Sequence, residues 1–298
     1  YLRQRPSENK TEEVLPSKEL NKEVTNEMSQ VPELEGLDKK IISKLAIKTE
    51  VQNSNIRQWT TFLNKLNEDG PKVTVAMVGK KDCLDECNKS VREALFHAAI
   101  TSYGAKLEIR KIDAETLERG ESIEQVFQNV NGIVIPGNYE QRGFLGLLAT
   151  VKYARERNIP YLGIDLGMQL MAIETARTML GWEDADSTEF IQNCEHALIS
   201  LPEEQAGFSA SGLMQLGAQT VKITKGTKLH EAYKKTTIVE RHRNKYTFDK
   251  NYASVLDEKG LITAALSELE KRCRTDCCAA FSMYPTDIHE LFSVADAG

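Results

Sequence analysis

From residue 73 onward, short β-rich runs alternate with longer amphipathic stretches. The runs are mostly apolar and predict buried parallel strands at 73–78, 107–112, 132–135 and 160–164. The stretches between them have helical spacing of apolar residues and predict helices at 91–103, 122–130, 144–158 and 168–180. This alternation is typical of an α/β fold with a doubly wound, mostly parallel sheet.

The C-terminal third follows a different pattern. Further β-rich runs predict strands near 196–201, 220–223, 238–243 and 261–268. We expect them to form an antiparallel extension before a final strand at 278–283.

The N-terminal seventy residues differ from the rest. Residues 1–31 are rich in Glu, Lys, Asn and Ser and predict a disordered tail. Leu34 to Leu66 predicts two amphipathic helices with a polar break near 49–54. We therefore expect a disordered acidic and polar tail, a helical linker and an α/β domain, at 1–33, 34–70 and 71–298.

Composition narrows the class of protein. The net charge of −6 and the pI near 5.6 give no general attraction for nucleic acid. No apolar stretch approaches 18 residues without charge, and no signal peptide is visible, so we expect no membrane contact. The chain is predicted to be intracellular, in the cytoplasm or the nucleus.

The six cysteines invite a zinc hypothesis, which the spacing does not favour. They include the sets Cys83-x3-Cys87 and Cys273-x3-Cys277-Cys278, which differ from a usual ligand knuckle and lack a histidine pair. We expect separately placed, reduced thiols, with no metal and no cofactor.

The candidate chemistry lies at a tight turn between a strand and a helix. Gly163 and Gly167 flank Asp165, at the position where such an elbow presents a reactive atom. The atom presented here is a carboxylate oxygen. As a structural role, we expect the carboxylate to cap the helix that follows, because unpaired N–H groups and the helix dipole favour an anion there.

Six motifs that occur in one order carry a family resemblance. They are VTVAMVGK (73–80), SVREAL (90–95), GIVIPG (132–137), LGMQL (166–170), LGWEDADSTEF (180–190) and ERHR (240–243). From about Lys72 to Leu291 the chain resembles the glutamine amidotransferase domain of CTP synthase, a class I glutaminase. The resemblance implies the fold of that family.

The resemblance also implies that three catalytic positions have changed. In the family a Cys-His-Glu triad hydrolyses glutamine. The matching positions here are Asp165, Tyr284 and Thr286, and Pro285 remains as the landmark of the His-Pro-Glu segment. The implied consequence is a protein that is not an enzyme. A hydrolase with remodelled chemistry is the alternative reading of the same site.

The resemblance divides the binding positions into altered and retained ones. The altered positions are Asn138 and Glu140 in the loop that forms the oxyanion hole, and Gln215 in place of an arginine that holds the carboxylate of the substrate. The retained positions are Gly137, Gln169 and Glu189. They are the candidates for residual binding of a small amide or amino acid.

Two functions fit these observations. The first is a pseudo-glutaminase that serves as a scaffold or a regulatory protein-interaction module, with Leu34 to Leu66 as a candidate surface for a protein partner. The alternative is the amidotransferase half of a larger CTP synthase that uses ammonia because glutamine hydrolysis is lost. Assembly into a homo-oligomer is compatible with both.

Overall fold

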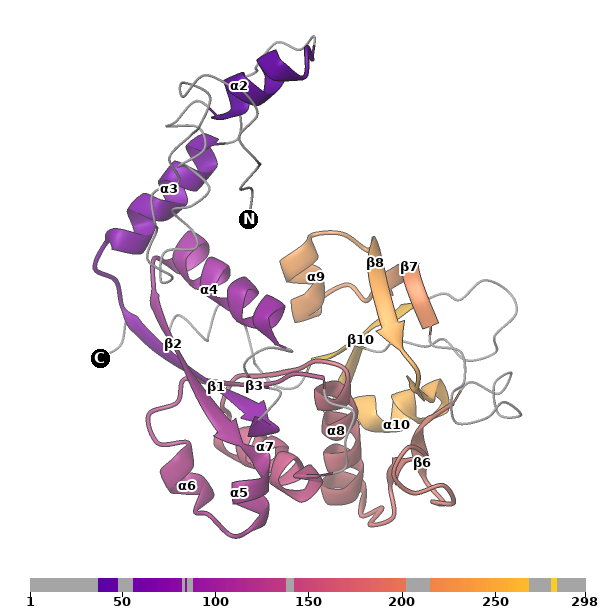
Figure 1. Cartoon of the computed structure of the whole chain (residues 1–298). Helices are drawn as coiled ribbons and strands as arrows, with labels where there is room; N and C mark the ends of the chain where they lie inside the picture. Colours follow the sequence, from indigo (N-terminus) through magenta and orange to yellow (C-terminus); the bar gives the residue numbers. More distant parts are fainter. Residues whose placement is uncertain are drawn as a thin grey trace, which may run out of the picture. The chain divides into compact units, whose positions relative to one another are not determined.

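The computed structural model describes residues 37–47, 56–81, 84, 88–137, 142–201, 215–267 and 280–282. Contacts divide the chain into two compact units, Tyr1–Asp69 and Gly70–Gly298 (Figure 1). The tail predicted at 1–31 and the polar break predicted at 49–54 lie outside the described residues.

The first unit contains two helices, as the apolar periodicity predicts. They are α2 (Leu37–Lys44) and α3 (Ile56–Asn67). Leu45, just after α2, is 65% exposed and Ile41 within it is 46% exposed, whereas Phe62 and Leu63 of α3 are buried.

The second unit is built on a four-stranded parallel sheet with the strand order β2-β1-β3-β4. Its strands are β1 (Lys72–Gly79), β2 (Lys106–Asp113), β3 (Gly132–Ile135) and β4 (Tyr161–Gly163). All four predicted parallel strands are therefore confirmed. The two central strands are almost entirely buried, which explains their continuous apolar runs.

The two faces of this sheet carry separate apolar clusters, because successive side chains of a strand point to opposite sides. Val73 and Val75 pack with α4 (Lys89–Tyr103) on one face. Ala76 and Val78 pack on the other face in the main core, to which α7 (Phe144–Arg157) and α8 (Leu166–Thr175) contribute. Figure 1 shows α4 and α7 on opposite sides of the sheet.

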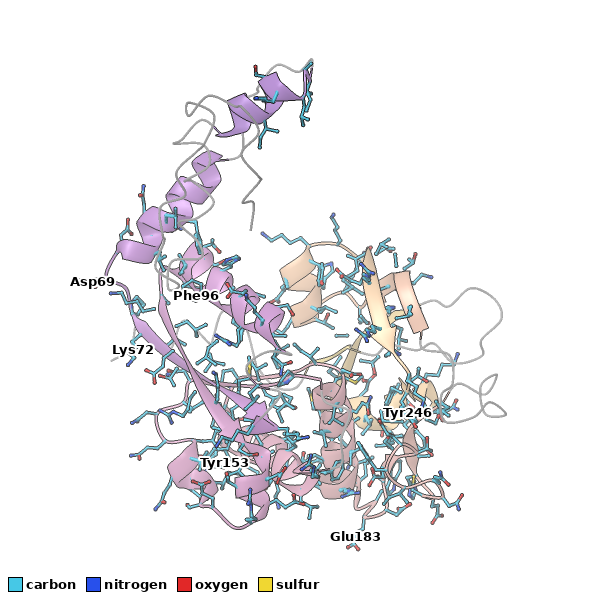
Figure 2. All side chains as sticks on the ribbon, viewed as in Figure 1. Asp69, Lys72, Phe96, Tyr153, Glu183 and Tyr246 are labelled. Carbon is cyan, nitrogen blue, oxygen red and sulfur yellow. The ribbon has the colours of Figure 1, made fainter. Side chains whose placement is uncertain are left out.

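The helix predicted at 122–130 is present but much shorter than predicted. Within that range the chain forms only α6 (Ile123–Val126), and a separate short helix, α5 (Ala114–Glu118), precedes it. The helix ends at its C-cap, Phe127, which is buried and stacks on Tyr153 at 5.4 Å between ring centroids. Tyr153 is labelled in Figure 2. Asn129 then adopts a positive φ of 59°, which turns the chain toward β3.

The helix predicted at 168–180 is confirmed, with a change in its last turn. After α8 the chain continues as the π-helix η4 (Ala176–Leu180), which ends at Gly181 in the left-handed conformation.

The antiparallel strands predicted in the C-terminal third are confirmed, but they belong to two sheets. One sheet has the order β11-β10-β7-β8. Its strands are β7 (Gln215–Ile223), β8 (Thr237–Asn244), β10 (Ile262–Ser267) and β11 (Ala280–Ser282). The helices beside it are α9 (Lys228–Tyr233), η6 (Lys250–Tyr252) and α10 (Ala253–Asp257).

The run near 196–201 does not extend that sheet, contrary to the prediction. It forms β6 (Ala197–Ser200) in a separate sheet with β5 (Asp186–Ser187) and β9 (Thr247–Phe248). The side chains of Leu198, Ile199 and Phe248 are buried in the main core, so these strands are held by the parallel sheet and its helices.

The described residues provide neither a membrane-spanning helix nor a metal-binding cluster. No helix among the described residues combines the length and apolar character needed to cross a bilayer. Within the same residues, no group of three or more His, Cys, Asp and Glu side chains is arranged to hold a metal ion.

Candidate functional site at the strand-to-helix elbow

The elbow lies between β4 and α8. The N–H of Ile164 donates to the carbonyl of Ile135 in β3 at 2.9 Å, which continues the strand pairing up to the turn. Asp165 follows with φ 54° and ψ −109°, a sparsely populated conformation for a residue that has a Cβ atom. The predicted elbow is thus present, and its central residue is strained.

Two glycines allow the close approach of helix and sheet at this turn. A Cβ atom on Gly167 would overlap the carbonyl oxygen of Ile135, and one on Gly163 would overlap the backbone of Gly167. The hydroxyl of Tyr161 donates to the carbonyl of Gly167 at 2.8 Å and fixes the first turn of α8. The Gly-x-x-x-Gly spacing therefore reflects packing of α8 directly on β3.

The side chain of Asp165 lies against Gly137. Its Cβ and Oδ2 atoms are both 3.2 Å from the point where a Cβ atom of Gly137 would be. Burial raises the pKa of the Asp165 carboxyl.

The expectation that Asp165 caps the helix with its carboxylate is wrong. Asp165 occupies the N-cap position, but its side chain accepts no capping hydrogen bond. Only its carbonyl serves α8, by accepting from the N–H groups of Met168 at 3.0 Å and Gln169 at 3.1 Å. The positive φ places the carboxyl beside Gly137 instead.

We expect the substitution Asp165→Gly to stabilise the domain by about 1 kcal/mol. Glycine adopts a positive φ without strain, and the variant loses a carboxyl that burial disfavours as an anion. Denaturant midpoints of the two proteins measure the difference. A variant less stable than the parent would show that the side chain of Asp165 holds the elbow together.

The control Asp165→Asn separates charge from backbone strain. The folded protein holds the proton of Asp165 more tightly than the unfolded chain does, because burial raises the pKa. The charge therefore destabilises the fold at neutral pH, and this effect vanishes below the unfolded pKa of about 3.9. We expect Asp165→Asn to raise stability at pH 7 and to leave it unchanged at a pH well below the unfolded pKa.

Glu189 lies within electrostatic reach of Asp165. Burial raises the pKa of Glu189, the negative charge of Asp165 raises it further, and Lys245 opposes both effects. The segment that carries Glu189 is braced by an ion pair between Arg177 and Asp186 at 2.6 Å. The elbow and the STEF segment (Ser187 to Phe190) thus bring two carboxyl groups together.

Gln169 contributes an acceptor near the start of α8. Its side chain is only 4% exposed, and among the described residues its Oε1 atom has no hydrogen-bond partner. A buried amide oxygen without a partner is costly, so it is suited to accept a bond from a ligand.

The other predicted site residues are described in part or not at all. Gln215 begins strand β7. The positions Asn138, Glu140, Tyr284 and Thr286 lie outside the described residues. The structure therefore brings Gly137, Asp165 and Glu189 together, with Gln169 one turn along the helix from Asp165.

Lys245 and Tyr246 were missed as site residues in the sequence. Burial and then the charge of Glu189 raise the pKa of Tyr246, which is labelled in Figure 2. The Lys245 ammonium lies 5.4 Å from the centre of the Tyr246 ring. The ERHR motif, which ends two residues before Lys245, was the available signal.

The charges and polar atoms around Asp165 determine which kind of ligand atom the site attracts. Two carboxyl groups and a buried amide oxygen attract a cation or a hydrogen-bond donor, and they oppose a developing oxyanion. Lys245 supplies a compensating positive charge beside Glu189.

The fold and the elbow are those of a class I glutamine amidotransferase domain. The family model "Glutamine amidotransferase class-I" matches residues 83–275, and the chain belongs to this family. Within the family it is related to the glutaminase domain of CTP synthase.

Individual relatives support this assignment. The CTP synthase of Flavobacterium psychrophilum is 40% identical over 228 residues, which cover 76% of this chain and 42% of the relative. That of Carboxydothermus hydrogenoformans is 38% identical over 234 residues, which cover 78% and 43%. The chain thus spans less than half the length of these CTP synthases.

A solved structure is similar along most of its length. The glutaminase domain of Trypanosoma brucei CTPS with bound acivicin is 29% identical with a TM-score of 0.61. The match covers 76% of this chain and 92% of that domain.

Proposed function

We propose that this chain is a catalytically silent glutaminase domain of the CTP synthase type, which acts as a scaffold or a regulatory protein-interaction module. The observation that carries the proposal is the position of the Asp165 carboxyl. It stands where the resemblance implies a cysteine nucleophile, and it packs against Gly137 in the segment where the resemblance implies the oxyanion hole.

The chemistry of a carboxylate at this place supports silence. An aspartate that attacked an unactivated amide would have to form an anhydride and expel an amine, which requires oxyanion stabilisation and a general acid. Here the Oδ2 atom of Asp165 lies against Gly137, in the segment where the resemblance implies the oxyanion hole. The charge of Glu189 adds to the negative potential at Asp165. An oxyanion would be destabilised rather than stabilised.

We expect purified protein to release no ammonia from glutamine above a control without protein. Turnover that disappears in Asp165→Ala would overturn the proposal in favour of a remodelled hydrolase. Ammonia release can be measured with a coupled dehydrogenase assay.

The variant Asp165→Cys provides the sharper control. A thiol without a base stays mostly protonated, so we expect neither turnover nor rapid labelling by acivicin, the compound bound in the Trypanosoma brucei domain. Rapid labelling would show that the rest of a glutaminase site is still assembled.

The second candidate is the amidotransferase half of a larger CTP synthase that depends on ammonia. The observation in its favour is that the chain matches whole CTP synthases over 42% and 43% of their length. Formation of CTP from UTP, ATP and ammonium by the native protein would support this candidate over the first.

The interaction role rests on exposed apolar surface. In the first unit Ile41, Leu45 and Ile47 are each between 46% and 65% exposed, in the segment Leu34 to Leu66 that we propose as one partner surface. Exposed apolar residues that cluster on a short segment are typical of protein interaction sites.

A further inference from the structure

Strand β8 forms an edge of the antiparallel sheet. In the described part of the chain it pairs with β7 on one side and with no strand on the other. Its eight residues, Thr237–Asn244, make it one of the longer strands of the domain. Long open edges are sites where another extended segment can pair.

The hydrogen-bond pattern shows which backbone groups face outward. The N–H of Ile223 donates to the carbonyl of Thr236 at 2.9 Å, and the register of the two strands is constant from there to Asn244. In an antiparallel pair, hydrogen-bonded positions alternate with positions that point away. The outward groups therefore belong to Thr237, Val239, Arg241 and Arg243.

These four residues are open in the structure. Their side chains are all exposed, and Val239 is 65% exposed. Within the ranges that the structure describes, none of them forms a further hydrogen bond or ion pair at this edge.

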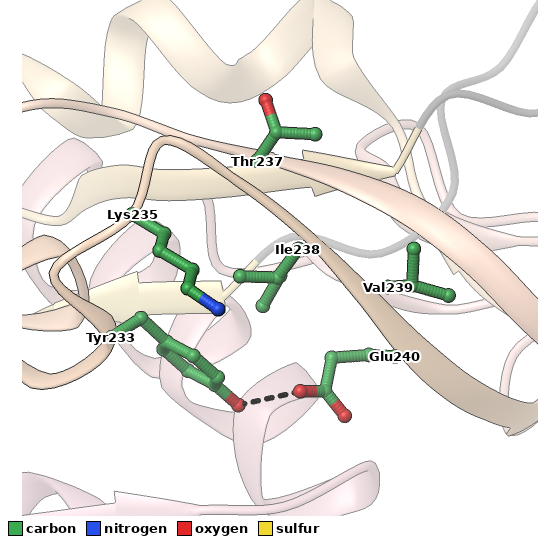
Figure 3. A pocket seen from close by; sticks show the side chains of 6 residues that line it. All are labelled: Tyr233, Lys235, Thr237, Ile238, Val239 and Glu240. Carbon is green, nitrogen blue, oxygen red and sulfur yellow. Dashed lines mark hydrogen bonds between the residues drawn. The ribbon is translucent and has the colours of Figure 1, made fainter.

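A surface depression of about 410 Å³ follows the same edge (Figure 3). It touches four consecutive residues of the strand, 237–240, together with Tyr233 and Lys235. Consecutive residues of a strand face opposite sides, so a depression that touches all four runs along the backbone edge. The hydroxyl of Tyr233 donates to Glu240 at 3.0 Å and holds the opposite wall in place.

The charged side chains along the β8 edge indicate which kind of extended segment would bind there. Arg241 and Arg243 project from the same face as Val239 and follow the lining residues along the strand, and the exposed Lys235 lines the depression itself. Glu240 projects from the opposite face and is engaged by Tyr233. An extended segment with acidic side chains two residues apart would pair with both arginines, while an apolar side chain would cover Val239.

A second copy of this chain fits the edge less well. Twofold pairing of two β8 edges would place the exposed arginines of both copies on one face of the joined sheet. Like charges directly or diagonally opposite in a sheet are destabilising.

We propose that the β8 edge binds an extended acidic peptide segment of a partner protein by adding a strand to the sheet. The proposal rests on the interaction role proposed above, and it names the partner chemistry. It does not depend on the silence of the elbow, since no elbow residue lines the depression.

The test uses the full chain and a labelled nonapeptide, Thr-Val-Thr-Glu-Thr-Glu-Thr-Val-Thr. Its symmetric sequence presents the same side chains in parallel and antiparallel pairing. We expect saturable binding by fluorescence anisotropy. Two further peptides carry methyl groups on alternate backbone nitrogens, one on the odd-numbered set and the other on the even-numbered set. One of the two should bind at least about tenfold more weakly, because its methylated nitrogens are those whose N–H groups pair with β8.

Charge reversal distinguishes this edge from other basic surface. The double variant Arg241→Glu and Arg243→Glu should bind the acidic peptide at least about tenfold more weakly and should gain binding of the peptide with lysine at both glutamate positions. The matched control, Lys225→Glu with Lys259→Glu, has the same net charge and should bind like the parent. Both control lysines are exposed and lie off the strand.

Three results would overturn the proposal. The first is that the double variant at Arg241 and Arg243 still binds the acidic peptide. The second is that neither methylated peptide binds more weakly than the unmethylated one. The third is that the parent chain forms a dimer and that the charge reversal dissociates it. The last would assign the edge to a second copy. None of them alters the ammonia measurement, so failure here is separable from failure of the proposed silence.

Discussion

The substitution Gly167→Ala is expected to destabilise the domain by about 3 kcal/mol or more. A Cβ atom at Gly167 would overlap the carbonyl oxygen of Ile135 and lie 3.1 Å from the Cβ atom of the same residue. The obstruction is backbone of a buried strand, so it cannot rotate away. Relief requires α8 to move off the sheet, which opens the main core.

The direction of this effect is opposite to helix propensity. Alanine in a helix interior is ordinarily favoured over glycine by about 1 kcal/mol, so propensity alone predicts a gain. Denaturant unfolding followed by circular dichroism gives the free energy of unfolding of both proteins. A variant as stable as the parent would mean that α8 is not packed directly on β3.

Gly181→Ala is the matched control. Gly181 has φ 72°, and a Cβ atom added there would have no neighbouring atom within 4 Å. Alanine at this position would therefore have a strained backbone conformation but no steric overlap with other residues. We expect a loss of only about 1–2 kcal/mol. The difference between the two variants isolates the contact between helix and sheet.

Local patterns were enough to predict the parallel sheet. Buried strands such as 73–78 and 132–135 are apolar because both faces are covered, and this signal does not depend on distant residues. The helix predicted at 122–130 was too long, because it ends at Phe127, which is buried in a distant contact, the stacking on Tyr153. The hydrophobic periodicity of residues 122–130 does not indicate this contact with Tyr153.

The elbow shows the same division between local and distant causes. The spacing of Gly163 and Gly167 predicts a tight turn, because only glycine permits such close backbone contact. The orientation of the Asp165 carboxyl depends on its positive φ and on Gly137, which lies in a different loop. A capping role was therefore a reasonable local inference that the tertiary structure overrides.

The charged and aromatic neighbours that interact electrostatically with Glu189 could not be predicted from local patterns either. Lys245 and Tyr246 come close to it because the chain passes from β8 to β9 beside the STEF segment. The order of strands in space, rather than any spacing in the sequence, sets that proximity.

An ion pair between α7 and α8 was likewise not predicted. Arg155 donates to both carboxylate oxygens of Glu174, at 2.9 and 2.8 Å, and the hydroxyl of Thr178 donates to the same carboxylate at 2.8 Å. The Glu174 side chain is 2% exposed and that of Arg155 is 19% exposed. The available signal was a glutamate directly after the apolar run 170–173.

We expect Arg155→Leu to destabilise the domain by about 3–5 kcal/mol at neutral pH. The variant leaves the buried Glu174 carboxylate with only the Thr178 hydroxyl to offset its desolvation. Glu174→Gln should cost less, because Arg155 is partly exposed and can turn toward Glu156, whose carboxylate is 3.7 Å away. Free energies of unfolding of the two variants test this asymmetry.

The double variant Arg155→Leu with Glu174→Leu gives the decisive comparison. It leaves no buried charge without a partner, so we expect it to recover most of the stability that Arg155→Leu alone loses. The exposed pair of Lys72 and Glu108 serves as a control: its atoms are only 2.6 Å apart, yet Lys72→Leu should change stability little because water screens both groups. If the double variant is as unstable as Arg155→Leu, the lost packing of the arginine stem, and not the buried charge, holds the two helices together.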